Sequence, residues 1–138
     1  MHALHEKGSV LHAARERLTC GLEIDLPEGV TIGKDDHTFT NVRIANWRHE
    51  ARSIAEIALV PAGEEHVLAH LDMDIAPMLT RIEGSPVFVG HHWFNGHPAI
   101  ESPKIACLDW SAGKGGKLVA YRWDGEQELS NDKLVWAA

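Results

Sequence analysis

The chain has 138 residues, of which 44% are hydrophobic and 24% are charged, and its formal net charge is −7. This length predicts a single domain over residues 1–138, with enough apolar side chains to build a core. The acidic balance and the lack of a basic run argue against nucleic acid as a partner. Neither a membrane-spanning apolar stretch nor the apolar segment of a signal peptide is present, so we expect no membrane partner and a cytoplasmic location.

The first half of the chain alternates between helical and extended patterns. Residues 9–19 have apolar positions at helical spacing, with Ser9 as a suitable N-cap and Gly21 as a suitable stop. Alternating polar and apolar residues predict short strands over 22–26 and 38–44. The other expected elements are a turn over 33–36, a helix over 46–58 and a short helix over 64–71.

The second half reads as a series of short strands. An apolar run over 87–89 predicts a buried, central strand that ends at Gly90 and is followed by His91. Further strands are expected over 104–109 and 117–123, and the short connection makes the first of them a neighbour of strand 87–89. The remaining expectations are a hairpin-type turn at Asp124-Gly125 and a last strand over residues 133–136.

His91 is the candidate site residue in this half. A strand that stops at a glycine puts the next side chain at its carboxyl edge, which is where ligands bind in open α/β sheets. Neutral imidazole is the commonest metal-binding side chain, so His91 is well placed to hold a metal ion. The plainer interpretation is a hydrogen-bonded histidine in the core or at a strand edge. If strand alternation continued, His92 would face away from His91.

The same segments resemble the C-terminal part of the calcineurin-like metallophosphoesterases. Within that family the resemblance is to the bacterial branch of serine/threonine protein phosphatases and symmetrical bis(5'-nucleosyl)-tetraphosphatases. It covers residues 86–124 well and residues 1–60 only loosely. The residues that carry it are Val87-Phe88-Val89-Gly90-His91, Cys107-Leu108-Asp109 and Gly115-Gly116-Lys117-Leu118-Val119-Ala120-Tyr121.

This resemblance implies both a fold and an activity. The expected fold is α/β (α+β), the C-terminal half of a two-sheet sandwich with a mixed sheet and flanking helices. The implied activity is phosphoric ester hydrolysis by a pair of divalent ions, Mn, Fe or Zn, that activate a bridging water. The implied partner is a phosphoester substrate, and His91 is the single metal ligand, with no catalytic or cofactor-binding residue besides it.

The family's other metal ligands come from three earlier motifs, Asp-x-His, Gly-Asp-x-x-Asp-Arg-Gly and Gly-Asn-His-Asp/Glu, and we expect none of them in this chain. We therefore expect part of a phosphatase, begun at an internal methionine or encoded by a truncated gene, that is inactive alone and self-associates through an uncovered sheet. The alternative is a non-catalytic interaction or structural module derived from the same fold. A third option is a Zn²⁺ or Ni²⁺ binder that uses His91, His92 and His97.

Several other residues invite a functional reading that we set aside. His66 and His70 have the i, i+4 spacing of a helical metal pair, but no glutamate lies between them, so we expect solvated side chains. Cys20 and Cys107 are far apart and are read as reduced thiols, the second in the core. Most of the ten histidines are expected on polar faces or turns.

The glycine-rich segment after Asp109 resembles a phosphate-binding loop only superficially. It opens a strand rather than a helix, so its glycines are expected to form a tight turn, and Asp109 is read as a turn or cap residue. The five tryptophans are expected to be core or interface anchors rather than a base-stacking platform.

Overall fold

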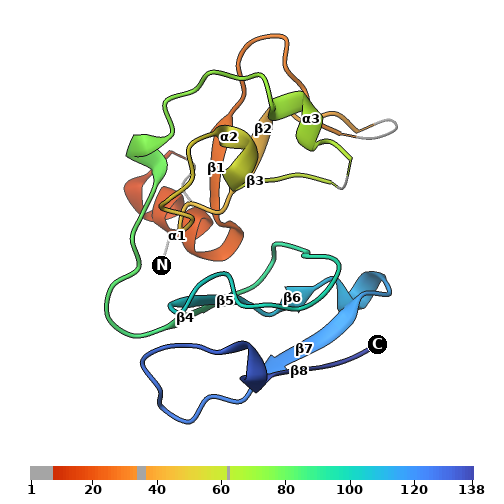
Figure 1. The fold of residues 1–138 in the computed structure, drawn as a ribbon. Helices are drawn as coiled ribbons and strands as arrows, with labels where there is room; N and C mark the ends of the chain where they lie inside the picture. The colour runs from red at the N-terminus through yellow and green to blue at the C-terminus, as the bar shows by residue number, and fades with distance from the viewer. Residues whose placement is uncertain (1–7, 34–36, 62) are drawn as a thin grey trace. The chain divides into compact units, whose positions relative to one another are not determined.

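The computed structural model describes residues 8–33, 37–61 and 63–138, and the chain divides into two compact units. Unit 1 is Met1–Thr80 and unit 2 is Arg81–Ala138. The structure is mixed α+β, with few helices and three small sheets, so the coarse fold class is confirmed (Figure 1). No helix in the described ranges has the length and apolar character needed to cross a membrane.

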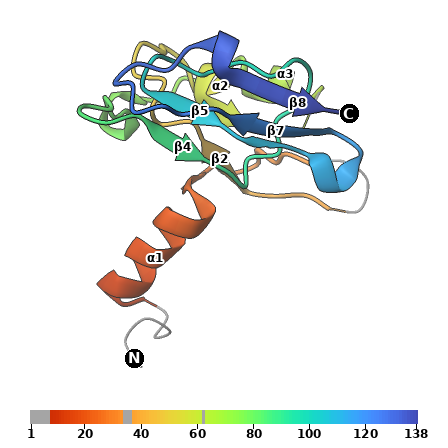
Figure 2. The same ribbon diagram turned by 90° about the horizontal axis from the view of Figure 1, so that it is seen from below.

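Unit 1 begins with helix α1 (Val10–Cys20), which the sequence predicts correctly at both ends. The Ser9 side chain accepts a hydrogen bond from the His12 amide at 3.1 Å, and Gly21 ends the helix with a φ of 88°. The helix extends away from the sheet of this unit and has no buried residue (Figure 2). Its apolar stripe is therefore open to solvent, and Leu18 is 88% exposed.

The sheet of unit 1 is antiparallel, in the order β1-β2-β3. Strand β1 (Leu22–Asp25) pairs with β2 (Asn41–Ile44), which pairs with the two-residue β3 (Ala58–Leu59). The first predicted strand is confirmed. The second is shorter than predicted, because Phe39 instead forms an isolated bridge with Ile32.

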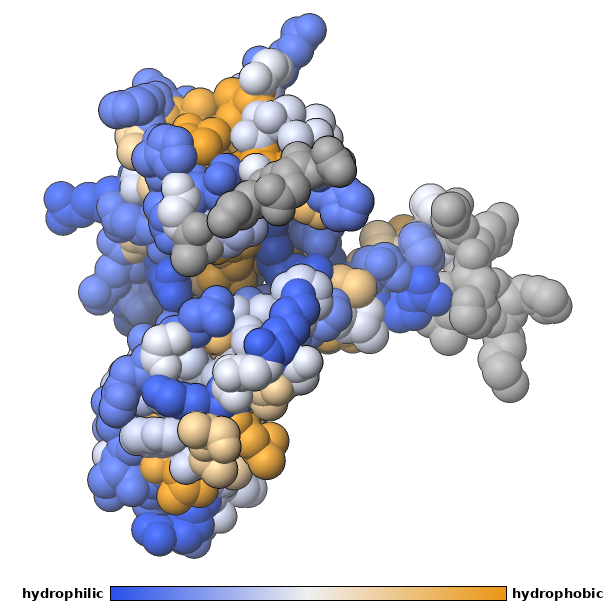
Figure 3. Space-filling view, turned by 90° about the vertical axis from the view of Figure 1, so that its right-hand side faces the viewer, coloured by the Kyte–Doolittle hydropathy of each residue, from blue (hydrophilic) through white to orange (hydrophobic). Residues whose placement is uncertain are grey.

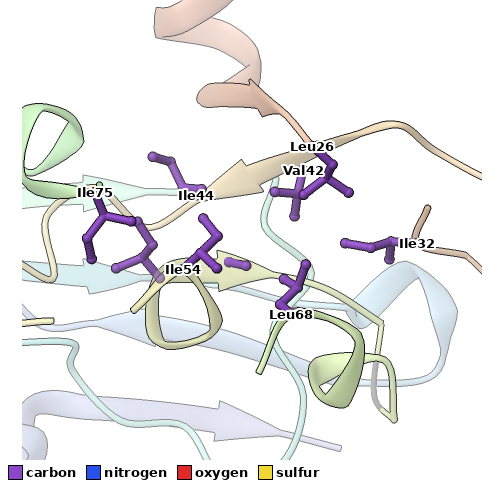
Figure 4. Packing of buried hydrophobic residues seen from close by; sticks show 9 residues of the cluster. Leu26, Ile32, Val42, Ile44, Ile54, Leu68 and Ile75 are labelled. Carbon is purple, nitrogen blue, oxygen red and sulfur yellow. The ribbon is translucent and has the colours of Figure 1, made fainter. Parts of the chain in front are cut away.

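The core of unit 1 lies between the sheet and two short helices, α2 (Ile54–Ile57) and α3 (Glu65–Leu68). Side chains from the strands, the helices and the loops converge there (Figure 4). A 3₁₀ turn, η2 (Ala76–Met78), follows. Burial of an aliphatic side chain stabilises the fold by about 1.5–3 kcal/mol, so this cluster supplies most of the drive to fold this unit. Its buried members are Leu26, Ile32, Val42, Ile44, Ile54, Ile57, Ala58, Leu68 and Ile75.

The helix predicted over 46–58 is wrong for its first half. Residues 46–53 form successive turns, in which the Arg48 amide donates to the Ala45 carbonyl and the Ala51 amide to the Arg48 carbonyl. These turns place Ala51 against the core without forming a continuous helix. The apolar residues can therefore pack inward from a backbone of successive turns. The helix predicted over 64–71 is also shorter, since only α3 forms.

Unit 2 contains one parallel pair and one antiparallel sheet. Strand β4 (Val87–Val89) pairs in parallel with β5 (Ile105–Cys107), in the register Val87↔Ile105. The antiparallel sheet has the order β6-β7-β8 and the bounds Asp109–Trp110, Lys117–Tyr121 and Leu134–Ala137. Two 3₁₀ turns, η3 (Ala112–Lys114) and η4 (Asn131–Lys133), precede β7 and β8.

Strand β4 lies beside β5 as predicted, but it is neither central nor buried. Within the described residues its sheet has two strands, and Val87 and Phe88 are 38% and 37% exposed. All three residues of β5 are buried instead. The residues 90–104 that join the two strands form a loop rather than the covering helix of a usual parallel crossover.

Three further boundaries differ from the prediction. The strand expected over 104–109 breaks at Leu108, where the chain passes from the parallel pair to the antiparallel sheet. The expected hairpin turn at Asp124-Gly125 is wrong, because a long loop over residues 122–130, followed by η4, joins β7 to β8. The last strand is confirmed as β8. The turn predicted over 33–36 falls mainly outside the described residues, as do His2 and His5.

Candidate functional site

The candidate site lies at the carboxyl end of the parallel pair β4–β5. His91 follows β4 after one glycine, and its side chain is exposed. Asp109 occupies the matching place after β5, since a Cβ placed on Gly90 would lie 3.9 Å from the Asp109 Cβ. Parallel strands therefore bring an imidazole and a carboxylate to one edge, although they are 18 positions apart in the sequence.

The backbone around this edge is strained. His91, Trp93 and Ser111 are the described non-glycine residues with positive φ, at 65°, 51° and 61°. A left-handed conformation costs a residue with a Cβ about 1–2 kcal/mol, so three such residues in one place must be held by surrounding contacts. Backbone strain of this kind is common at functional sites, and here it occurs at and around His91, the candidate residue of the sequence analysis.

Hydrogen bonds fasten the loop that carries His91 to the segment that follows β5. The Phe94 amide donates to the Asp109 carbonyl at 2.9 Å, and the Ser111 hydroxyl donates to the Phe94 carbonyl at 3.2 Å. The Asp109 carboxylate accepts from the Ser111 amide at 3.1 Å, as expected of a turn residue. The Phe94 ring meets the buried Trp110 ring edge-on at 5.5 Å. The loop is thus tied down on its inner side.

Aromatic contacts order the histidines of the loop. The His91 and Trp93 rings are 5.6 Å apart at an interplanar angle of 73°, and the Lys114 ammonium lies 3.9 Å from the centroid of the Trp93 ring. His92 is half-buried and lies 6.4 Å from the Phe94 ring. The two histidines therefore contact different rings, one exposed and one against the core.

A second stack of the same composition lies farther along the loop. His97 meets Trp136 of β8 edge-on at 4.9 Å, and the Lys117 ammonium is 5.9 Å from the Trp136 centroid. Lys117 also donates to the Gly96 carbonyl at 2.8 Å. Folding thus places lysines on two exposed tryptophan rings, which the sequence analysis missed because the partners are about 20 positions apart.

The chain's other metal-ligand candidates are scattered. Within the described residues, histidine, cysteine, aspartate and glutamate side chains form no group of three that could hold a metal ion. His91, His92 and His97 form no such group in this part of the chain. His66 and His70 are both exposed, and the first contacts the Gly63 carbonyl at 2.7 Å.

The expectation that none of the three earlier metal-binding motifs occurs is wrong for the shortest of them. Asp35-Asp36-His37 matches the pattern Asp-x-His, but both aspartates lie outside the described residues. His37 is exposed in the connection between the bridging residues Ile32 and Phe39. The segment therefore offers a loop histidine rather than one at the end of a buried strand.

The glycine-rich segment forms the predicted tight turn. Gly115 has a φ of 82°, and the Lys114 amide donates to the Ser111 carbonyl at 2.8 Å. A Cβ on Gly116 would lie only 2.1 Å from the Trp110 carbonyl oxygen. This position therefore requires glycine because there is no room for a side chain. The turn sets the direction of β7 and places Lys114 over Trp93.

Comparison with protein-family models, with characterised proteins and with solved structures found no match.

Proposed function

We propose that this chain is the C-terminal part of a metallophosphoesterase-type phosphatase, in which His91 is a ligand to one of two divalent metal ions. In this proposal, unit 2 is a piece of the two-sheet sandwich of that family, and the substrate is a phosphoric ester. The observation that carries the proposal is the position of His91. It is an exposed imidazole that follows β4 after one glycine, at the same end of the parallel pair as Asp109, which follows β5 after one leucine.

The chain's own residues fit only part of such a site. His91 offers one exposed imidazole, and Asp109 offers a carboxylate that already accepts a hydrogen bond from Ser111. A two-metal site needs several more ligands, and catalytic metals generally take three or more protein ligands each. The role we assign to this chain is therefore to present His91, and we assign it no catalytic step of its own.

The test is a pair of phosphatase assays with an aryl phosphate and Mn²⁺. The chain alone should give no turnover above that of its His91→Ala variant. Joined to a first half that carries the three earlier motifs, it should become active, and His91→Ala should then remove most of that activity. His66→Ala and His70→Ala are the matched controls and should have little effect. Turnover by the chain alone, or a joined enzyme indifferent to His91→Ala, would refute the proposal.

A second candidate function, an interaction module that associates with a second copy of this chain, is favoured by the outer face of β7 and β8. In the register of these strands, Leu118 lies opposite Ala137, and Ala120 opposite Val135. All four are exposed, at 69% for Leu118 and 55% for Val135. Figure 3 shows apolar patches among hydrophilic atoms on one side of the surface. Exposed apolar side chains gathered on one sheet face favour association.

Light scattering over a range of concentrations tests this second function. Leu118→Lys should shift the chain towards monomer, because a charge on the sheet face cannot be buried in a pair of copies without a large cost. Gln127→Lys makes a comparable change on the exposed loop after β7 and serves as the control. A wild-type chain that stays monomeric at high concentration and binds no hydrophobic dye would contradict it.

A further inference from the structure

The loop that joins β4 to β5 contains the dipeptide Asn95-Gly96, which has a chemistry of its own. The backbone nitrogen of the residue after an asparagine can attack the amide carbon of the asparagine side chain. A glycine in that place favours the attack, because no Cβ hinders the approach of the nitrogen. The other asparagines precede bulkier residues, in the pairs Asn41-Val42, Asn46-Trp47 and Asn131-Asp132.

The surroundings of this dipeptide are open. Asn95 and Gly96 are both exposed, and a Cβ built on Gly96 would meet nothing within 4 Å. Gly96 has a φ of 88°, in the left-handed region that glycine adopts without strain. Water therefore has access to this part of the loop, where the reaction needs it.

The hydrogen bonds of the loop leave the attacking nitrogen available. The Asn95 side-chain amide donates to the Trp93 carbonyl at 3.2 Å, and the Gly96 carbonyl accepts from the Lys117 ammonium at 2.8 Å. These bonds hold the nitrogen that would leave and the peptide group that follows. Among the described residues, the Gly96 amide donates no hydrogen bond, so its nitrogen can attack without first losing an acceptor.

We propose that Asn95 is a site of spontaneous deamidation through a succinimide formed with the Gly96 backbone nitrogen. Hydroxide removes the proton of the Gly96 amide, and the nitrogen then forms a bond to the Asn95 Cγ. The side-chain nitrogen takes a proton from water and leaves as ammonia. Water next opens the ring, either at the new bond to give an aspartyl residue or at the original peptide bond to give an isoaspartyl linkage through Cγ. Water is consumed and ammonia released, and nothing is oxidised or reduced.

Either product changes the loop beside Lys117. A neutral amide becomes a carboxylate, next to the residue whose carbonyl Lys117 holds. The isoaspartyl product also adds a methylene group to the backbone just before Gly96, which displaces this carbonyl from the lysine. The ring contact of His97 with Trp136, now at 4.9 Å, should therefore loosen as the protein ages.

The experiment follows the full chain by peptide mapping and mass spectrometry during incubation in mildly alkaline buffer, with the urea-denatured chain as the reference. Conversion of Asn95 in the folded chain should be less than about tenfold slower than in urea, because an exposed loop opens at little cost. Asn131, which precedes an aspartate, should stay largely intact. Asn95→Gln should abolish conversion at this position, because its longer side chain closes a ring much less readily. Gly96→Ala should slow conversion about tenfold through the added methyl group.

The comparison with the denatured chain decides the inference. An Asn95 that stays intact in the folded chain while it reacts in urea would show that the loop holds the dipeptide away from the reactive geometry, and would overturn the proposal. Equal conversion of Asn95 and Asn131, or unchanged ammonia release in Asn95→Gln, would overturn it as well. Asn95→Gln keeps an amide on the side chain and the glycine at its positive φ, so it keeps the test valid if Gly96→Ala disturbs the loop.

Discussion

The two cysteines occupy opposite environments, and each residue's chemistry follows from that difference. Cys107 lies in β5 with no solvent exposure, and burial raises the pKa of its thiol to about 11. Cys20 ends α1 and is partly exposed. Only a thiolate attacks a disulfide reagent, so Cys107 should be inert while the chain is folded.

We expect a disulfide reagent at pH 8 to modify one thiol per folded chain rapidly and the second only on unfolding. In Cys20→Ser the rapid phase should disappear, because the buried thiol is both protonated and inaccessible. Stopped-flow absorbance with and without denaturant measures this. A rapid phase that survives in Cys20→Ser would mean that β5 opens readily to solvent.

Glu126 is the centre of an ion-pair and hydrogen-bond network in the loop between β7 and β8. Its carboxylate meets the Lys133 ammonium at 2.9 Å and accepts from the Tyr121 hydroxyl at 2.9 Å. Desolvation by itself would raise the pKa of Glu126, but the hydrogen bonds from Lys133, backbone amides and Tyr121 lower it to about 2. The same contact with Glu126 raises the pKa of Lys133.

A carboxyl group whose pKa is lowered by folding stabilises the folded chain at pH values above its ordinary pKa. This contribution is lost as the pH falls and the carboxylate is protonated. The contribution of Glu126 should be present above pH 4.5 and fade as the pH falls from 4.5 towards 2. Glu126→Gln should therefore lower the urea midpoint at pH 6 and flatten its dependence on pH below 4.5. Glu128→Gln, two positions away and exposed, should leave both unchanged. Parallel curves for Glu126→Gln and wild type would contradict the network.

At the scale of elements, the turn before β7 is the most sharply constrained connection. A methyl group on Gly116 would collide with the Trp110 carbonyl, whereas one on Gly113 would meet nothing within 4 Å. We expect Gly116→Ala to destabilise the chain by about 1–3 kcal/mol through this overlap. Gly113→Ala should be neutral or stabilising by a few tenths of a kcal/mol. Urea denaturation of both variants measures the difference. Equal midpoints would show that the backbone of the turn can shift to accommodate the methyl group without a loss in the free energy of unfolding.

Elements defined by local signals were predictable from the sequence. Helix α1 follows from its cap and stop, since Ser9 and Gly21 act on backbone groups within a few residues. The helix over 46–58 failed because apolar spacing has no such local anchor before Ser53, whose hydroxyl donates to Glu56 at 3.1 Å beside the start of α2. Tertiary contacts decided the backbone there.

The strand edge that carries His91 was predictable from the sequence, but the contacts around it were not. The strand ending at Gly90 and the neighbouring β5 both formed, because apolar runs and a short connection determine them. Positive φ values at His91 and Trp93 could not be expected, since non-glycine residues rarely adopt them without specific contacts. The contact of Lys114 with the Trp93 ring could not be predicted either, because it depends on how the intervening loop and turn fold.

Over the whole molecule, stability is distributed between two separate clusters of buried side chains. Unit 1 has a cluster built on fully buried aliphatic residues such as Ile44, Ile54 and Leu68. The cluster of unit 2 centres on Trp110, Val119 and Leu134, with partly buried aromatic and aliphatic side chains around it. Helix α1 belongs to neither, because none of its residues is buried.

This distribution predicts a large difference between two truncations of the same size. Ile54→Ala removes a fully buried side chain and should cost unit 1 about 2–5 kcal/mol, because the surrounding core cannot close the cavity completely. Leu18→Ala removes a side chain that is 88% exposed and should change stability by less than about 0.5 kcal/mol. Native-state exchange of the Ala45 amide, which donates to the Ile57 carbonyl at 2.7 Å, measures both. A cost for Leu18→Ala as large as that for Ile54→Ala, growing with protein concentration, would show that a second copy covers α1 in solution and would overturn the assignment of stability to the core alone.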